Sequence, residues 1–173
     1  MYDVYASQVL EFLATEFKFP AGIEIESSDD IPDKDKRISI YVFQKPLEFA
    51  LNEIVKANPR YRWELNDGVV NLLPKDATKS IVETKIDKFD AANMKRIDVR
   101  KAIGNIPELS EKLNSLGLEF TTISAWPSRD RRDTMVLTVD IKDKTLKSLL
   151  NEIAKKTGFW SASRFSGFFF VSF

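Results

Sequence analysis

One feature constrains the fold of this chain more than any other, namely a segment that recurs 99 positions later. Residues 37–74 align without a gap with residues 136–173, and the tetrapeptide LNEI begins at both Leu51 and Leu150. The other identities are Lys45/Lys144, Leu47/Leu146, Lys56/Lys155 and Gly68/Gly167. Self-similarity at a fixed offset indicates one supersecondary unit present twice.

A strand and a helix are predicted at matching places in each copy. Apolar residues alternate with the period of a strand at Ile38, Ile40 and Val42, and again at Leu137, Val139 and Ile141. A helical stripe with i, i+3, i+4, i+7, i+8 spacing follows: Leu47, Ala50, Leu51, Ile54 and Val55 in the first copy, and Leu146, Leu149, Leu150, Ile153 and Ala154 in the second. Thr145 is the predicted N-cap of the second helix.

Each copy is predicted to close with a β-hairpin. In the first copy Tyr61, Trp63 and Leu65 are expected to point inward, and Asp67-Gly68 is a favoured two-residue turn. In the second copy Ser166-Gly167 takes the place of that turn and precedes the return strand FFFVSF. The offset places Phe169 and Val171 on the inward face of this strand.

Upstream of each repeated segment the match is looser. A helical stripe at Val9, Leu10, Leu13 and Phe17 precedes a strand at Ile23 and Ile25; Leu109, Leu113 and Leu116 precede Leu118 and Phe120. An extra strand is expected in SIVETKIDKFD, followed by a short helix near 99–103. We therefore predict an α+β protein of two similar modules, 1–74 and 80–173, joined by a linker at 75–79, each reading helix–strand–strand–helix–hairpin.

Composition excludes several classes of function. Lysine and arginine together number 26, as do aspartate and glutamate, so the balanced charge offers no general attraction for nucleic acid. Histidine and cysteine are absent, which removes the commonest general base, the thiolate nucleophile and the usual transition-metal ligands. No apolar run approaches the length that spans a bilayer. We expect no cofactor, no stoichiometric transition metal and no enzymatic activity.

The segment TLKSLLNEIAKKTGFWSASRFSGFFFVSF resembles the short N-terminal domain shared by secretins and TonB-dependent receptors. The matching residues are Thr145, Leu146, Leu150, Ile153, Thr157 and Gly158. The first copy matches at Leu47, Leu51 and Ile54, but Pro46, Asn58 and Pro59 occupy the other three positions of the motif. The resemblance implies two helices packed between small sheets and a role in binding another protein of the bacterial envelope. It implies a periplasmic or envelope location for a mature chain without its leader; a cytoplasmic location is the alternative.

Three groups of polar residues invite site hypotheses. The acidic loop with Asp29, Asp30, Asp33 and Asp35 lacks the glycine and glutamate of a calcium-binding EF-hand, so a solvated loop is favoured. The segment WPSRDRRD is also favoured as a solvated loop, with Trp126, Arg129 and Arg131 kept as candidates for binding a partner. Glu24 and Glu64 have no spacing that supports an acid–base pair.

The most informative site prediction concerns Phe168 and Phe170, which fall on the outward face of the last strand. A strand that is apolar on both faces is either central or covered by another element. We expect the first module or the extra strand to cover the two phenylalanines. The alternative is a surface that docks a partner, including strand addition at a sheet edge.

These observations favour a non-enzymatic module for protein–protein interaction or assembly in the bacterial envelope, with another envelope protein or a second copy of the chain as the partner. The alternative is a small-ligand-binding protein or hydrolase that uses a cleft between the two modules.

Overall fold

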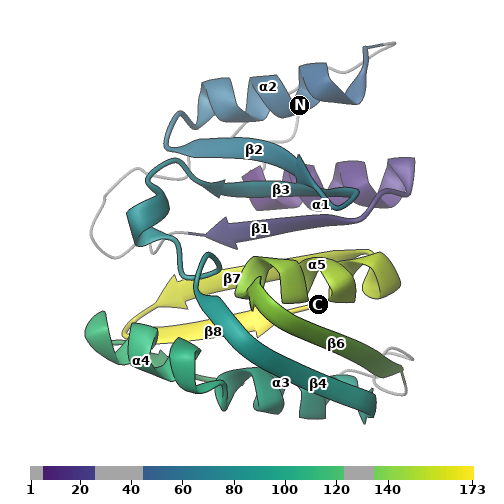
Figure 1. The fold of residues 1–173 in the computed structure, drawn as a ribbon. Helices are drawn as coiled ribbons and strands as arrows, with labels where there is room; N and C mark the ends of the chain where they lie inside the picture. The colour runs from purple at the N-terminus through teal and green to yellow at the C-terminus, as the bar shows by residue number, and fades with distance from the viewer. Residues whose placement is uncertain (1–5, 26–44, 123–134) are drawn as a thin grey trace.

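A six-stranded sheet runs through the whole protein in this computed structural model, which describes residues 6–25, 45–122 and 135–173 (Figure 1). The predicted α+β class is confirmed. The first half of the chain supplies α1 (Ala6–Phe17), β1 (Ala21–Ile25), α2 (Leu47–Ala57), β2 (Tyr61–Asn66), β3 (Val69–Pro74) and the 3₁₀ turn η1 (Ala77–Lys79). The second supplies β4 (Lys85–Lys95), α3 (Arg96–Gly104), α4 (Pro107–Ser115), β5 (Glu119–Phe120), β6 (Val136–Thr145), α5 (Leu146–Thr157), β7 (Phe159–Phe165) and β8 (Phe168–Ser172).

The sheet consists of two strand triplets placed side by side, in the order β2-β3-β1-β7-β8-β5. We call β2-β3-β1 the N-half and β7-β8-β5 the C-half. In each half two strands form an antiparallel hairpin, and a third strand lies beside the second hairpin strand and parallel to it. The halves join where β1 and β7 run parallel over five residue pairs, from Ala21 opposite Phe159 to Ile25 opposite Ser163.

The helices of the two halves lie on opposite faces of the sheet. Alternate residues of β3 show this: Val70 and Leu72 pack with α1 and α2, whereas Val69 and Leu73 belong to the core of the C-half. The C-half core contains α3, α4 and α5 and the separate β4–β6 pair, with α5 between the two sheets (Figure 1). The halves are therefore related by a half-turn about an axis that crosses the strands.

The described elements of the repeated segments keep the predicted offset, and the upstream elements, for which the sequence predicted only a looser match, overlap at the same offset. The helix pairs α2/α5 and α1/α4 and the strand pairs β2/β7, β3/β8 and β1/β5 overlap when 99 is added to the residue numbers. Both hairpin turns have positive φ at each residue, with 52° and 78° at Asp67 and Gly68 and 49° and 80° at Ser166 and Gly167. This is the geometry that two-residue hairpins prefer. A duplicated module stays an interpretation, as do the boundaries 1–74, 75–79 and 80–173.

Local sequence explains most of the elements. The apolar stripe of α5 is buried as predicted, whereas in α2 Ala50, Leu51 and Ile54 are buried but Leu47 and Val55 are half-buried. The Thr145 hydroxyl accepts a hydrogen bond from the Ser148 N–H, which caps α5. The extra strand predicted at 80–90 is β4, which instead runs from Lys85 to Lys95, and the short helix predicted near 99–103 is α3. The alternating residues Leu137, Val139 and Ile141 are buried on β6. The strand predicted at Ile38, Ile40 and Val42 lies outside the described residues.

Three apolar residues predicted to lie in the core are instead exposed. Leu65 is 66% exposed near the end of β2, Phe17 is 62% exposed in the last turn of α1, and Leu116 is 41% exposed just after α4. Each stands at the end of an element, where the neighbouring layer no longer covers the side chain. Among the described helices, none has the length and apolar character needed to cross a membrane.

Candidate functional site: a covered and an open face of one sheet

Each half of the sheet has one face that its own helices do not cover. In the N-half this face carries Val69, Asn71 and Leu73 of β3, and in the C-half it carries Phe168, Phe170 and Ser172 of β8. The corresponding residues of the two sets are 99 positions apart. The candidate functional site is the second of these faces, which we call the open face, and the first shows what covers such a face.

The N-half face is covered by the segment that follows η1. Ile81 and Val82 lie over it and are fully buried, as are Val69 and Leu73 beneath them. The start of α5 is tied to the same segment, because the Leu146 N–H donates to the Thr84 carbonyl and the Lys147 N–H to the Val82 carbonyl.

Glu24 of β1 anchors this covering segment. Its fully buried carboxylate accepts hydrogen bonds from the Ser80 hydroxyl and, at 2.7 Å, from the Ile81 N–H. Arg164 of β7 approaches the same carboxylate to 4.0 Å. Burial raises the pKa of Glu24, since desolvation of the charged form outweighs the lowering by Ser80, Ile81 and Arg164.

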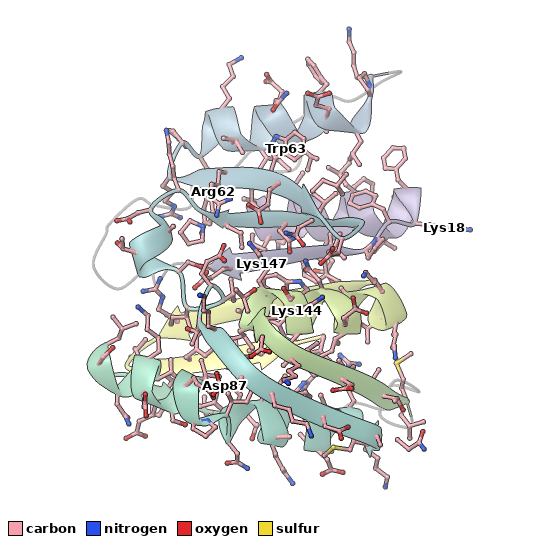
Figure 2. The ribbon with its side chains drawn as sticks, in the orientation of Figure 1. Lys18, Arg62, Trp63, Asp87, Lys144 and Lys147 are labelled. Atoms are coloured by element: carbon pink, nitrogen blue, oxygen red, sulfur yellow. The ribbon has the colours of Figure 1, made fainter. Side chains whose placement is uncertain are left out.

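Lys147, itself buried, joins the two halves through a partly buried ion network. Its Nζ atom lies 2.7 Å from a carboxylate oxygen of Glu64 on β2 and 2.8 Å from one of Glu83 in the covering segment. Arg62 of β2 pairs with both carboxylates, at 3.4 Å from Glu83. Figure 2 shows Lys147 where the halves meet.

The charges in this network stabilise one another. Burial by itself raises the pKa of Glu64, but hydrogen bonds from Lys147 and Arg62 lower it overall. For Lys147 burial by itself lowers the pKa, but the two carboxylates, Glu64 and Glu83, raise it overall. Glu24 and Glu64 therefore have opposite pKa shifts, but each is engaged in contacts that hold the halves together.

The open face of the C-half has a different character. Phe168 is 43% exposed, Phe170 is half-buried and Ser172 is exposed, whereas Phe169 and Val171 on the other side of β8 are buried as predicted. The neighbouring strand β7 contributes the small side chains of Ser161 and Ser163 to the same face. The expectation that the first module or the extra strand covers the two phenylalanines is wrong for Phe168, which is 43% exposed, whereas Phe170 is half-buried. The half-turn places α1 and α2 over β1–β3, and the extra strand β4 packs on the other side of β8.

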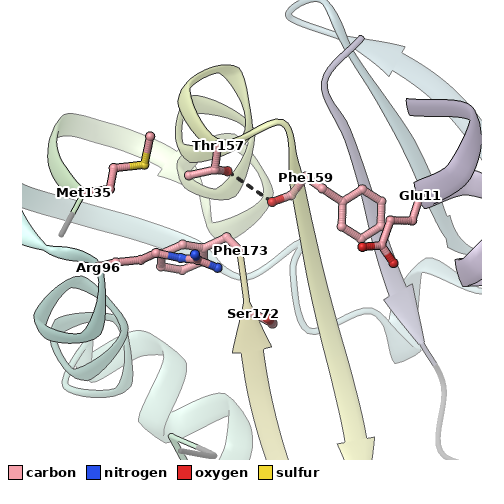
Figure 3. Close-up of a pocket in the computed structure, with 7 residues that line it drawn as sticks. All are labelled: Glu11, Arg96, Met135, Thr157, Phe159, Ser172 and Phe173. Carbon is pink, nitrogen blue, oxygen red and sulfur yellow. Dashed lines mark hydrogen bonds between the residues drawn. The ribbon is translucent and has the colours of Figure 1, made fainter. Parts of the chain in front are cut away.

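A small cavity opens where β7 begins and β8 ends (Figure 3). It has a volume of about 120 Å³ and is lined by Glu11, Arg96, Met135, Thr157, Phe159, Ser172 and Phe173. Arg96 and Arg100 lie over the Phe173 ring, 5.7 and 5.1 Å from its centre, and Arg100 donates a 3.1 Å hydrogen bond to the Phe173 carbonyl. Sites for drug-sized ligands span ~300–1,000 Å³, so this cavity suits a much smaller group.

The structure separates the candidate residues taken from the sequence. Phe168 and Phe170 lie together on the open face, whereas Trp126, Arg129, Arg131 and the four aspartates of the acidic loop lie outside the described residues. Within the described ranges no group of three or more carboxylates is placed to hold a metal ion.

The buried polar residues escaped sequence reasoning. Lys147 and Asn151 lie on a second side of α5, beside its apolar stripe, and both are buried because the N-half packs against them. Lys147 and Asn151 are buried only because the N-half packs against α5. The 99-residue offset does not predict this burial, since their counterparts Glu48 and Asn52 are exposed.

Comparisons of the chain with family models, with curated proteins and with solved structures give no match.

Proposed function

We propose that this protein is a non-enzymatic module that binds another protein through the open face of its C-half. The observation that carries the proposal is the 43% exposure of Phe168, beside half-buried Phe170, on a regular strand. An aromatic side chain gains much from burial, because Phe, Tyr and Trp each bury ~150–250 Å² when covered. Apolar side chains that gather on a face with small polar neighbours are typical of protein contact surfaces.

The N-half supports this proposal by showing what such a face can accept. There a turn, closed by a hydrogen bond from the Thr84 N–H to the Ile81 carbonyl, lies over the strands and buries Ile81 and Val82. Ser80 and the Ile81 N–H supply polar contacts to the sheet. An apolar turn of a partner protein would make contacts of the same kind with Phe168 and Phe170. The resemblance of α5 and its hairpin to the secretin and TonB-receptor domain favours a location in the bacterial envelope.

Photo-crosslinking at the open face tests the proposal. A benzoylphenylalanine introduced in place of Phe168 should give a specific crosslinked protein in the native cells. The control carries the same group in place of Glu111, an exposed residue of α4 on the other side of the sheet. A product formed from position 168 and not from position 111 supports the proposal, and equal products or none from position 168 contradict it.

A further inference from the structure

The junction between the two halves is an interface whose two sides can each be defined. One side is the β7 edge together with the side of α5 that carries Lys147, Asn151 and Ala154. The other side is the β1 edge together with the covered face of β3. Asn151 links the sides, because it accepts from the Trp160 indole at 2.9 Å and its amide lies 3.5 Å from the Asn66 carbonyl.

The first side of this junction occurs again at the N-half end of the sheet. There β2 has the hairpin position of β7, and α2 has the helix position of α5. The counterparts of Lys147 and Asn151 on α2, Glu48 and Asn52, are exposed, and Val55 is half-buried. Two large apolar residues accompany them, Phe49 at 38% exposure and Leu65 at 66%. We call α2 and β2 together the donor surface.

The second side of the junction occurs again at the C-half end of the sheet. Here β5 pairs with β8 as β1 pairs with β3, and the residues that correspond to Val69 and Asn71 are Phe168 and Phe170. The N–H groups of Glu119 on β5 and of Thr121 just after it donate to the carbonyls of Gly167 and Phe169, so the alternation of the strand directs the backbone groups of Phe120 outward. We call the β5 edge and the open face together the acceptor surface.

We propose that a second copy of this chain docks head to tail, with its donor surface on the acceptor surface of the first copy. This proposal rests on the proposed function and names the partner. The β2 strand of the second copy extends the sheet parallel to β5, and its α2 lies over Phe168 and Phe170 as α5 lies over Val69. Because the two surfaces differ, an assembly of any length keeps one free donor surface and one free acceptor surface at its ends. It therefore closes into a ring or grows as a filament.

The intermolecular junction is expected to be weaker than the internal one. Gly22 lets the Trp160 indole lie against the β1 backbone, where a Cβ atom would come within 1.9 Å of the ring. The counterpart of Gly22 on the acceptor surface is Thr121, whose side chain prevents that close approach. The apolar contact of Phe49 and Leu65 with Phe168 and Phe170 replaces the ion network of Lys147. Association should therefore depend on concentration, and high salt should weaken it little.

Two variants that block one surface each test the proposal. Phe168→Ser with Phe170→Ser removes the acceptor contacts, and Phe49→Ser with Leu65→Ser removes the donor contacts. Leu116→Ser is the control, since Leu116 is also an exposed apolar residue but belongs to neither the donor nor the acceptor surface. Analytical ultracentrifugation should show oligomers for the wild type and the control at high protein concentration, and monomers for each double variant alone.

Mixing the two double variants is the decisive step. Each retains one intact surface, so an equimolar mixture should form a one-to-one dimer and nothing larger. A mixture that stays monomeric, or a donor variant that still oligomerises, overturns the head-to-tail arrangement. Circular dichroism checks that each variant is folded. If a double variant does not fold, the single variant Phe168→Ser or Leu65→Ser is used for that surface instead.

Wild-type protein that stays monomeric up to ~1 mM, where even a weak association is visible, also overturns the proposal. The crosslink at position 168 then separates the two proposals. A product that contains a different protein leaves the proposed function standing and removes self-assembly. The absence of any product removes both.

Discussion

Val69 and Phe168 hold the same place in the two halves of the sheet and have opposite environments. Each begins the second strand of a hairpin, 99 positions apart, and each faces away from the helices of its own half. Val69 is fully buried, whereas Phe168 is 43% exposed. The difference shows that the local fold does not decide burial here, because the cover over Val69 comes from Ile81, Val82 and α5, outside the N-half triplet.

The polar residues around the two faces follow the same contrast. Over the N-half, Glu24, Glu64 and Lys147 are held by specific hydrogen bonds and ion pairs, which fix the covering segment in one position. On the C-half face the two exposed residues of β8 are Phe168 and Ser172, which can accept a partner without leaving a charge unpaired. A buried charge that loses its partner is costly, whereas an apolar surface can be covered and uncovered reversibly.

Truncation of the two matching leucines should give the largest effect. Leu51 and Leu150 are 2% and 0% exposed in the cores of α2 and α5. Leu51→Ala and Leu150→Ala should each lower the free energy of unfolding by ~2–5 kcal/mol, the range for a buried leucine. Chemical denaturation measures both values. A loss at only one of the two positions would break the equivalence of the halves.

Removal of the central lysine should give a smaller but still large effect. Lys147→Ala leaves Arg62 as the only cation among the described residues that Glu64 and Glu83 share and should lower the free energy of unfolding by about 2 kcal/mol. The matched control is Glu48→Ala at the corresponding exposed position of α2, where a change within about 0.5 kcal/mol is expected. Similar losses for the two variants would show that the ion network of Lys147 does not add to the stability of the covered face.

The pH dependence of stability should reveal Glu24. Its pKa is raised in the folded protein, so its favourable contribution is complete below the ordinary value of 4.5 and is lost as the pH rises through the folded-state pKa. Glu24→Gln should therefore become more stable relative to the wild type as the pH rises from 4.5 through that range. Denaturation curves recorded at several pH values measure this difference. A difference that stays constant with pH would contradict burial of an ionisable group at this site.

Glu64 should respond in the opposite direction. Its pKa is lowered in the folded protein, so its contribution is present above 4.5 and is lost as the pH falls through the folded-state pKa. The destabilisation caused by Glu64→Gln should therefore diminish in acid. Thermal melts of this variant and the wild type across the acid range provide the test, and a penalty that persists there would contradict the ion pair with Lys147.

The open face should give the smallest effect on stability. Phe168→Ser with Phe170→Ser should change the Tm by only a few degrees, because Phe168 is already partly in water and Phe170 is half-buried. A loss as large as that of Leu150→Ala would mean that the two phenylalanines belong to the core. Calorimetry of dilute, monomeric protein separates this intrinsic effect from any effect of association.

The sequence predicts the elements of this fold better than their arrangement. The stripe from Leu146 to Ala154 and the turn at Ser166-Gly167 are local signals, and the structure confirms both. The half-turn between the halves has no local signal, since it depends on whether β1 meets β7 in the parallel or the antiparallel sense. For that reason the exposure of Phe168 and the burial of Lys147 could not be predicted, although the inward face of Phe169 and Val171 could.

Cysteine labelling tests the central contrast most directly, because the chain contains no cysteine of its own. Single variants Val69→Cys and Phe168→Cys are treated with a thiol reagent under native conditions, with the protein dilute. The Phe168→Cys thiol should react at nearly the rate of an unfolded chain, and the Val69→Cys thiol should react only when the protein opens, slower by a factor of at least ~10³. Equal protection at the two positions would show that the open face is covered and would contradict the account.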